Sequence, residues 1–300
     1  MIDALISSAL LLAVPLVLAA LGGLIHRLSG VVNIGLEGQM LVGALVGAAI
    51  SGLAASWLLG ALAGALAGAL AGLVMSLVIT RLNANQIIVG LGFVTVTTGV
   101  IGYILRGRLG VSGTLRVSGL HPLPTLTIPG VDRVPVLGAV VSGKDPLFWF
   151  ALVLIPLVAW ALRATPWGLR VRATGSGPDA SRSLGLATKR IQDGAGCLAG
   201  ALAGLAGAQL SLGQVGLFNE HMTAGRGYIA LAAFYFGRNR PWPTAAACLL
   251  FAAFEALQIR LQTQGIAADL VQTLPYLVVV VVLAATGIAN HRKTARGITT

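Results

Sequence analysis

Charged residues are scarce in this chain, and their scarcity indicates its class. Asp, Glu, Lys and Arg make up 10% of the 300 residues, whereas hydrophobic residues make up 56%, and the mean hydropathy is +0.89. An ordinary water-soluble domain is about 25% charged. A water-soluble fold could not bury this much apolar surface, so the composition predicts a membrane protein.

Cysteine is also nearly absent. Cys197 and Cys248 both lie in apolar runs, without CxxC spacing and without a neighbouring histidine. We therefore expect neither a disulfide nor a metal site, and we interpret both residues as small packing residues.

The motifs of common enzyme sites are missing as well. The sequence contains neither a GxxxxGK[ST] loop for nucleotide phosphates nor an HExxH helix for zinc. The four histidines are scattered along the chain: His26, His121, His221 and His291. We expect no catalytic residue, no metal and no cofactor in this chain.

Long apolar runs are what the sequence has in abundance. They predict about nine helical segments, at residues 4–25, 35–54, 57–80, 86–105, 147–163, 192–212, 224–237, 243–262 and 268–288. The seventh is too short to cross a bilayer alone, so it is expected to be a broken or re-entrant piece. The strict alternation of an outer-membrane barrel is absent. The fold class is therefore all-α, a polytopic helical membrane protein with about 8–10 transmembrane segments and broken or re-entrant helices.

The placement of the basic residues predicts the orientation. The net charge of +11 would suggest nucleic acid in a soluble protein, but no aromatic-basic interleaving is present, so we expect contact with membrane lipid and none with nucleic acid. The loop 164–191 and the tail after residue 290 are rich in Arg and Lys, and both should be cytoplasmic. An odd number of crossings then places the N-terminus outside. The loop 106–146 is expected to be external although it is also basic.

A glycine repeat marks the third segment. Residues 60–72 read "GALAGALAGALAG", which places Gly60, Gly64, Gly68 and Gly72 on one helical stripe. Such a stripe lets another helix approach closely, so we expect a tight helix–helix seam. The alternative is compositional drift in a helix that faces lipid.

Three polar side chains interrupt the apolar stretch "SGVVNIGLEGQ", namely Asn33, Glu37 and Gln39. A carboxylate inside a membrane costs several kcal/mol unless it meets a partner, a cavity or water. Glu37 could bond backbone groups freed at Gly35 and Gly38, or it could line a translocation pathway with the two amides. Both readings stay open.

Two further polar groups lie in the fourth and eighth segments. Asn83 or Asn85 could cap the fourth helix, which Gln86 opens. Glu255, Gln258 and Gln262 share one face of the eighth segment. This polar stripe could line a cavity or bridge to another helix.

The loop "WGLRVRATGSGPDASRSLGL" contains a short amphipathic run at about 179–186. Its less polar face carries Ala180, Ser183, Leu184 and Ala187. A short helix at the end of a bundle could dock in a groove of a soluble protein. The alternative is a generic basic loop.

Four stretches carry a family resemblance: "GGLIHRLSGVVNIGLEGQMLVGA", "WGLRVRATGSGPDASRSLGL", "GRGYIALAAFYFGRNRPW" and "LPYLVVVVVL". The chain resembles the permease subunits of bacterial ABC importers related to ribose and branched-chain amino-acid permeases, and within them the nucleoside and simple-sugar branch. The resemblance implies a single permease domain over residues 1–300, in the bacterial inner membrane, with a cytoplasmic C-terminus. It implies three kinds of protein partner: an ATP-binding subunit that holds ATP and magnesium, a second permease subunit and a solute-binding protein.

The resemblance also assigns expected roles to residues. A translocation path is expected at Asn33, Glu37, Gln39, Asn85, Gln86, Glu255 and Gln258, and contacts that couple to the ATPase are expected at Gly168, Arg170, Gly175, Pro178, Ala180 and Gly185. The alternatives are a branched-chain amino-acid permease of the same type and a stand-alone secondary carrier or channel.

Overall fold

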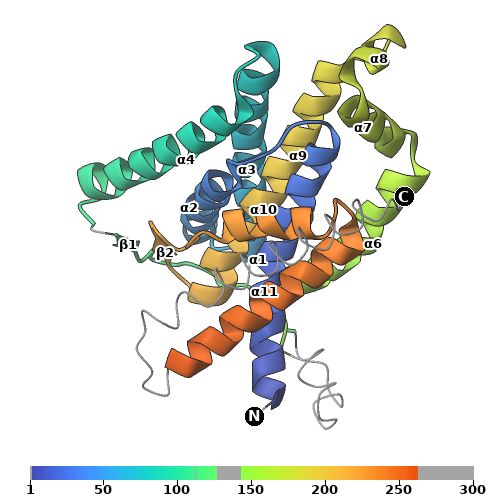
Figure 1. Ribbon diagram of the computed structural model, residues 1–300. Helices are drawn as coiled ribbons and strands as arrows, with labels where there is room; N and C mark the ends of the chain where they lie inside the picture. The colour runs from blue at the N-terminus through green and yellow to red at the C-terminus, as the bar shows by residue number, and fades with distance from the viewer. Residues whose placement is uncertain (1, 112, 127–142, 263–300) are drawn as a thin grey trace.

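The structure is a computed structural model and describes residues 2–111, 113–126 and 143–262 (Figure 1). The order of the elements is α1 (Ile2–Leu28), α2 (Leu36–Ala54), α3 (Trp57–Arg81), α4 (Gln86–Tyr103), the π-helical η1 (Ile104–Arg108), β1 (Thr114–Leu115), α6 (Pro146–Ala164), α7 (Pro166–Ser176), α8 (Pro178–Ser183), α9 (Thr188–Gln209), the π-helical η3 (Leu210–Val215), β2 (Phe218–Asn219), α10 (Arg226–Phe236) and α11 (Pro241–Gln262).

The helical membrane class is confirmed. Within the described ranges, seven helices are long and apolar enough to span a bilayer. They correspond to the first six expected segments and the eighth. The seventh expected segment is α10, which has 11 residues and is too short to cross alone, as predicted. The ninth expected segment, 268–288, lies outside the described residues, and so does the basic tail.

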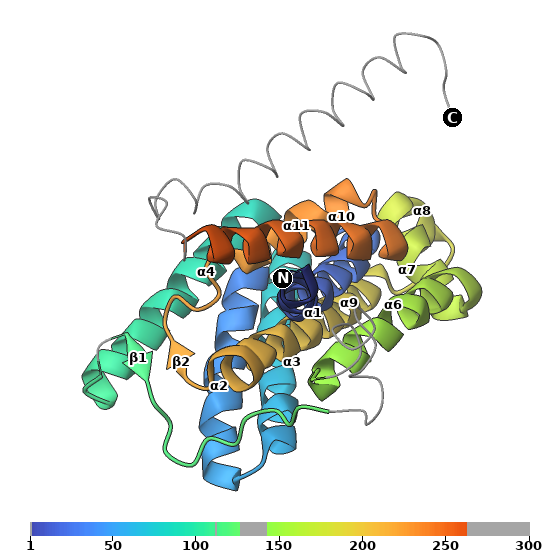
Figure 2. The same cartoon turned by 90° about the horizontal axis from the view of Figure 1, so that it is seen from below.

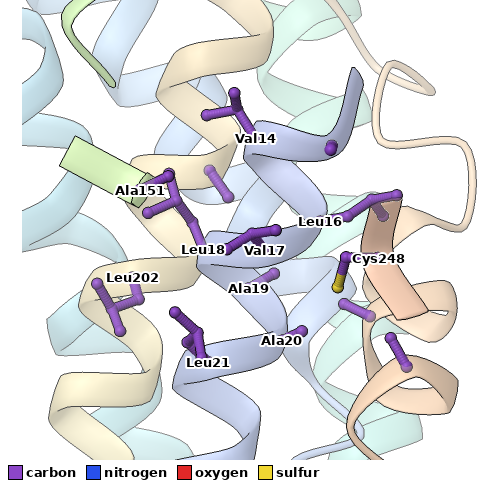
Figure 3. Close-up of a cluster of buried hydrophobic side chains, with 14 of the residues drawn as sticks. Val14, Leu16, Val17, Leu18, Ala19, Ala20, Leu21, Ala151, Leu202 and Cys248 are labelled. Atoms are coloured by element: carbon purple, nitrogen blue, oxygen red, sulfur yellow. The ribbon is translucent and has the colours of Figure 1, made fainter. Parts of the chain in front are cut away.

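The core is built around α1. Its side chains Leu16, Leu18, Leu21 and Leu24 are fully buried. Figure 3 shows this helix between α9, α6 and α11, with Leu202, Ala151 and Cys248 pointing toward it. Cys248 is a free thiol in the apolar core, which confirms its interpretation as a packing residue. Removing such side chains from water is the main favourable term in the packing of the core.

The glycine stripe forms the predicted seam. Gly60 and Gly64 lie against the backbone of α2 at Gly47 and Gly43, and Gly68 and Gly72 lie against the backbone of α9 at Gly200 and Gly196. A Cβ on Gly200 would come within 2.8 Å of the Cα of Gly72. Because neither helix has a side chain at the contact, the backbones pack directly on each other.

The two ends of the molecule differ. α7 and α8 project at the end opposite to the N-terminus, whereas the antiparallel β1–β2 pair lies to the side, near the outer end of α4 (Figure 1). α4 leans away from the bundle (Figures 1 and 2). Only 17% of its span is buried, the smallest share among the seven.

Candidate functional site

The chain unwinds between α1 and α2. Gly30 has a φ of +101°, and residues 31–33 have no regular structure. The backbone N–H of Val32 donates to Oε1 of Gln86 at 2.8 Å. The break lies at residues 31–33, whereas α2 begins at Leu36 and runs unbroken past Gly38, so the expectation of freed backbone at Gly38 is wrong. A side chain from the start of α4 supplies the hydrogen bond that the break needs.

Asn33 and Gln39 pair with each other at this break. Both are fully buried, and Nδ2 of Asn33 donates to Oε1 of Gln39 at 2.9 Å, while Nε2 of Gln39 lies 3.4 Å from Oδ1 of Asn33. A reciprocal amide pair satisfies two buried polar groups without water. Their part in a translocation path stays a prediction.

Glu37 caps a helix that is distant in sequence. Its Oε1 accepts from the backbone N–H of Gly225 at 2.8 Å, and its Oε2 accepts from that of Gly227 at 2.7 Å. These N–H groups lie at the start of α10, where a helix has unsatisfied donors and a positive partial charge. Of the two readings, the structure gives Glu37 a backbone partner, but on α10 and not at Gly35 or Gly38. Glu37 is 9% exposed.

Arg226 begins α10 and pairs with Glu255 of α11. Its Nη1 also donates to the carbonyl of Met222 at 2.9 Å. The polar stripe on α11 therefore bridges to another helix at Glu255, which was one of the two alternatives. Gln258 is half-buried, and its side chain makes no hydrogen bond to another side chain or to the backbone within the described residues.

Asn85 is the N-cap of α4. Its Oδ1 accepts from the backbone N–H groups of Ile87 and Ile88, at 2.9 and 3.4 Å. This confirms the capping interpretation for Asn85. The other residues of the predicted path fall into two groups: the break holds Asn33, Gln39 and Gln86, whereas Glu37 and Glu255 both bond the start of α10.

The predicted coupling loop folds as a helical hairpin of α7 and α8. Two of its glycines are positions of close approach. Gly168 packs on the end of α6, where a Cβ would lie 2.6 Å from the carbonyl oxygen of Leu162. Gly175 packs on the end of α1, where a Cβ would lie 2.9 Å from the backbone nitrogen of Gly30. Glycine is required at both contacts because any side chain would separate the helices.

The other predicted coupling residues point outward. Arg170, Pro178, Ala180 and Gly185 are exposed, and Gly185 has a φ of +81° that ends α8 in a left-handed turn. Of the predicted less polar face, Leu184 is 82% exposed, whereas α8 rests on the bundle through Ser181. The hairpin is thus packed on the ends of α1 and α6, and it exposes a small, partly apolar surface that includes Ala180 and Leu184.

Sequence reasoning missed an acidic centre beside the hairpin. Asp193, in the second turn of α9, accepts from Thr80 at 2.6 Å and from Arg81 at 2.7 Å. The neighbouring Gln192 donates to the carbonyl of Ser29 at 3.1 Å, next to the helix break. The signal that identified Glu37, a carboxylate in an apolar run, would also have found Asp193.

No group of three His, Cys, Asp or Glu residues that could hold a metal ion is present in the part of the chain that the structure describes. The contacts above are helix caps, helix breaks and ion pairs between helices. Each of them joins two helices or satisfies backbone groups at a helix end.

Within the described residues the architecture is that of a multi-pass helical membrane protein with a helical hairpin packed on one end of the bundle. The family described as "Branched-chain amino acid transport system / permease component" matches residues 5–283, and the chain belongs to this family.

Three curated relatives cover most of the chain. The guanosine ABC transporter permease protein NupQ of Bacillus subtilis is 30% identical over 85% of this chain and 81% of its own length. The nucleoside ABC transporter permease protein NupC of Lactococcus lactis is 29% identical over 93% and 90%. The glucose ABC transporter permease protein TsgB13 of Haloferax volcanii is 28% identical over 96% and 78%. No solved structure matches the chain significantly.

These similarities confirm the expected class. The chain is an ABC transporter permease, and its relatives are permease subunits rather than enzymes.

Proposed function

We propose that this chain forms the translocation path of an ABC importer for a nucleoside or a simple sugar. In this proposal a separate ATP-binding subunit hydrolyses ATP, a solute-binding protein delivers the solute, and a second permease subunit completes the path. The names of the relatives, which include guanosine, nucleoside and glucose permeases, support this solute class over a branched-chain amino acid.

The α7–α8 hairpin is the observation that carries the proposal. Gly168 and Gly175 allow it to pack closely on α6 and α1, while Ala180 and Leu184 are exposed. A partner that binds these exposed residues would therefore move the ends of two membrane helices together with the hairpin. Force can pass to the bundle only through such packed contacts.

Charge supports the placement of the hairpin in the cytoplasm. Arg170, Arg172 and Arg182 are all exposed, and Arg81 lies at the same end, where it pairs with Asp193. Basic residues concentrate on the cytoplasmic side of membrane proteins. The C-terminus is proposed to lie on that side as well.

Reconstitution tests the proposal. The permease, its genomic neighbour ATPase and a co-encoded binding protein are purified together and placed in proteoliposomes. We expect uptake of guanosine, ribose or glucose that requires ATP and the binding protein. Uptake by the permease alone, driven by an ion gradient, would instead identify a secondary carrier, and uptake of leucine alone would refute the solute class.

A further inference from the structure

The described residues include a groove of about 800 Å³ along one side of α4. One wall is a face of α4 and η1. The other is the loop after β2, at Glu220 and His221. Sites for small molecules are typically about 300–1,000 Å³, so the groove has the size of a ligand site.

The α4 wall of the groove mixes the apolar residues Val94 and Tyr103 with a stripe of polar and small residues. The stripe consists of Thr95, Thr98, Gly99, Gly102 and Arg106. The steps between successive positions are three, one, three and four residues, so all five lie on one helical face. Val96 and Val100, on another face, are 64% and 50% exposed. In a membrane span, a polar stripe faces water or protein, and an apolar stripe can face lipid.

The hydroxyl oxygens of Thr95 and Thr98 on this stripe can still accept hydrogen bonds. The hydroxyl of Thr95 donates to the carbonyl of Leu91 at 3.0 Å, and that of Thr98 donates to the carbonyl of Val94 at 2.9 Å. Each oxygen keeps its lone pairs for another donor. A Cβ on Gly99 would meet nothing within 4 Å, so packing alone does not explain the small residue there.

The mouth of the groove holds an ion pair. Nη2 of Arg106 lies 2.9 and 3.0 Å from the two carboxylate oxygens of Glu220. The Glu220 side chain is 12% exposed, whereas that of Arg106 is 64% exposed and that of His221 is 75% exposed. Glu220 is thus shielded on one side and flanked by two donor side chains that solvent can reach.

The local fold holds this ion pair in position. Arg106 belongs to the π-helix η1. π-Helices are rare in proteins, and those that occur are often found at functional sites. The backbone N–H of Glu220 donates to the carbonyl of Gly113 at 2.9 Å, and Asn219 bonds Thr114 across the β1–β2 pair at 2.9 Å. A preorganised polar cluster binds a ligand at a lower entropic cost than a mobile one.

We propose that this groove is a binding site for the transported solute, and that the Arg106–Glu220 pair with His221 recognises a polyhydroxylated ring. A sugar or a ribose presents neighbouring hydroxyl groups that both donate and accept. The groove offers acceptors at Glu220, Thr95 and Thr98, and donors at Arg106 and His221. Because the two charges of the ion pair balance each other, the site suits an uncharged solute. Tyr103, a residue of the groove wall that is 67% exposed, supplies an aromatic face for the sugar ring.

This inference rests on the proposed function and deepens it, because it names residues that contact the solute. None of them is among the predicted path residues. α4 buries only 17% of its span, so one side of the groove is open in this chain.

Cysteine accessibility tests the groove without a solute. Thr98→Cys and Gly99→Cys are compared with Val96→Cys and Val100→Cys in the assembled importer, with Cys197 and Cys248 replaced by alanine. A membrane-impermeant thiosulfonate reagent is added outside. We expect the first pair to react about tenfold faster or more, because water reaches a polar stripe and not a face in contact with lipid. Equal reaction of both pairs would overturn the groove as an aqueous path.

Uptake kinetics test recognition. Guanosine, ribose, glucose and leucine are the probes, with the complete importer in proteoliposomes. Glu220→Gln and Arg106→Gln should each raise KM by about tenfold or more, the loss expected for hydrogen bonds to a charged group. Arg108→Gln removes the same charge from an exposed position outside the groove and should keep the KM of the parent. Gly99→Ala, on the groove wall and away from the ion pair, should leave protein yield unchanged.

The outcomes separate the two proposals. If the parent imports a probe and Glu220→Gln keeps its KM, the recognition site is wrong and the importer function stands. If the parent imports none of the hydroxylated probes, the proposed solute class is wrong, and the labelling result then decides whether the groove is an aqueous path.

Discussion

The carboxylate of Glu37 lies 2.7 Å from the backbone nitrogen of Gly227, 190 residues further along the chain. The contact joins the start of α2 to the start of α10. A Cβ on Gly227 would lie 2.8 Å from Oε2 of Glu37, so glycine lets the two helices meet. Glu37 thus caps the N-terminus of α10, a helix too short to cross the membrane.

Glu37→Ala should destabilise the permease. The change leaves the buried N–H of Gly227 and the partly buried N–H of Gly225 without acceptors. A buried unsatisfied donor costs about 1–3 kcal/mol, so the apparent Tm in detergent should fall and uptake should be lost. Asp179→Ala removes an acid whose side chain is 91% exposed and is the control for stability. An unchanged Tm for Glu37→Ala would show that the cap contributes nothing.

Gly200→Ala should open the seam between α3 and α9. The new methyl would strike the α3 backbone, with the Cα of Gly72 only 2.8 Å away. The cost of such overpacking is about 1–3 kcal/mol, read as a lower Tm. Gly194→Ala, on the same helix, meets nothing within 4 Å and should raise stability slightly, because alanine favours a helix over glycine. Equal effects of the two variants would contradict the seam.

Asp193 and Arg81 should be energetically coupled. They lie 2.7 Å apart with side chains 8% and 48% exposed, whereas Asp179 and Arg182 lie 3.0 Å apart with side chains 91% and 59% exposed. A double-mutant cycle with Asn and Gln should give a coupling energy for the first pair and none measurable for the second, because solvent screens an exposed pair. The measurement is the Tm of each variant in detergent. A coupling energy near zero for both pairs would refute the prediction.

Two substitutions in the hairpin should separate stability from coupling. Gly175→Ala would clash with the backbone at Gly30, so it should lower both the Tm and uptake. Ala180→Arg adds a side chain at an exposed position, so the Tm should stay unchanged while the ratio of ATP hydrolysed to solute transported rises several-fold. A normal ratio in Ala180→Arg would argue against α8 as the contact with the ATPase.

Local patterns in the sequence were enough for much of the fold. The apolar runs predicted the spans in the described residues, and the length of 224–237 predicted that α10 would be short. The glycine spacing at 60–72 predicted the seam, and a cap was expected at Asn83 or Asn85, of which Asn85 is the one in the structure. Each of these is a property of consecutive residues, governed by helix period, helix length or backbone geometry.

The partners of the polar groups depended on the tertiary structure. The sequence indicated that Glu37 needs a partner, but it did not identify the α10 N-terminus. It indicated a polar stripe at Glu255, and the fold selected Arg226 as its partner. In the groove beside α4, Arg106 pairs with Glu220, which lies 114 residues further along the chain. A buried charge in a low-dielectric interior needs a hydrogen-bond or ion-pair partner, and the sequence alone shows that such a partner is needed. Which group is that partner depends on how the helices pack, and only the folded chain decides that.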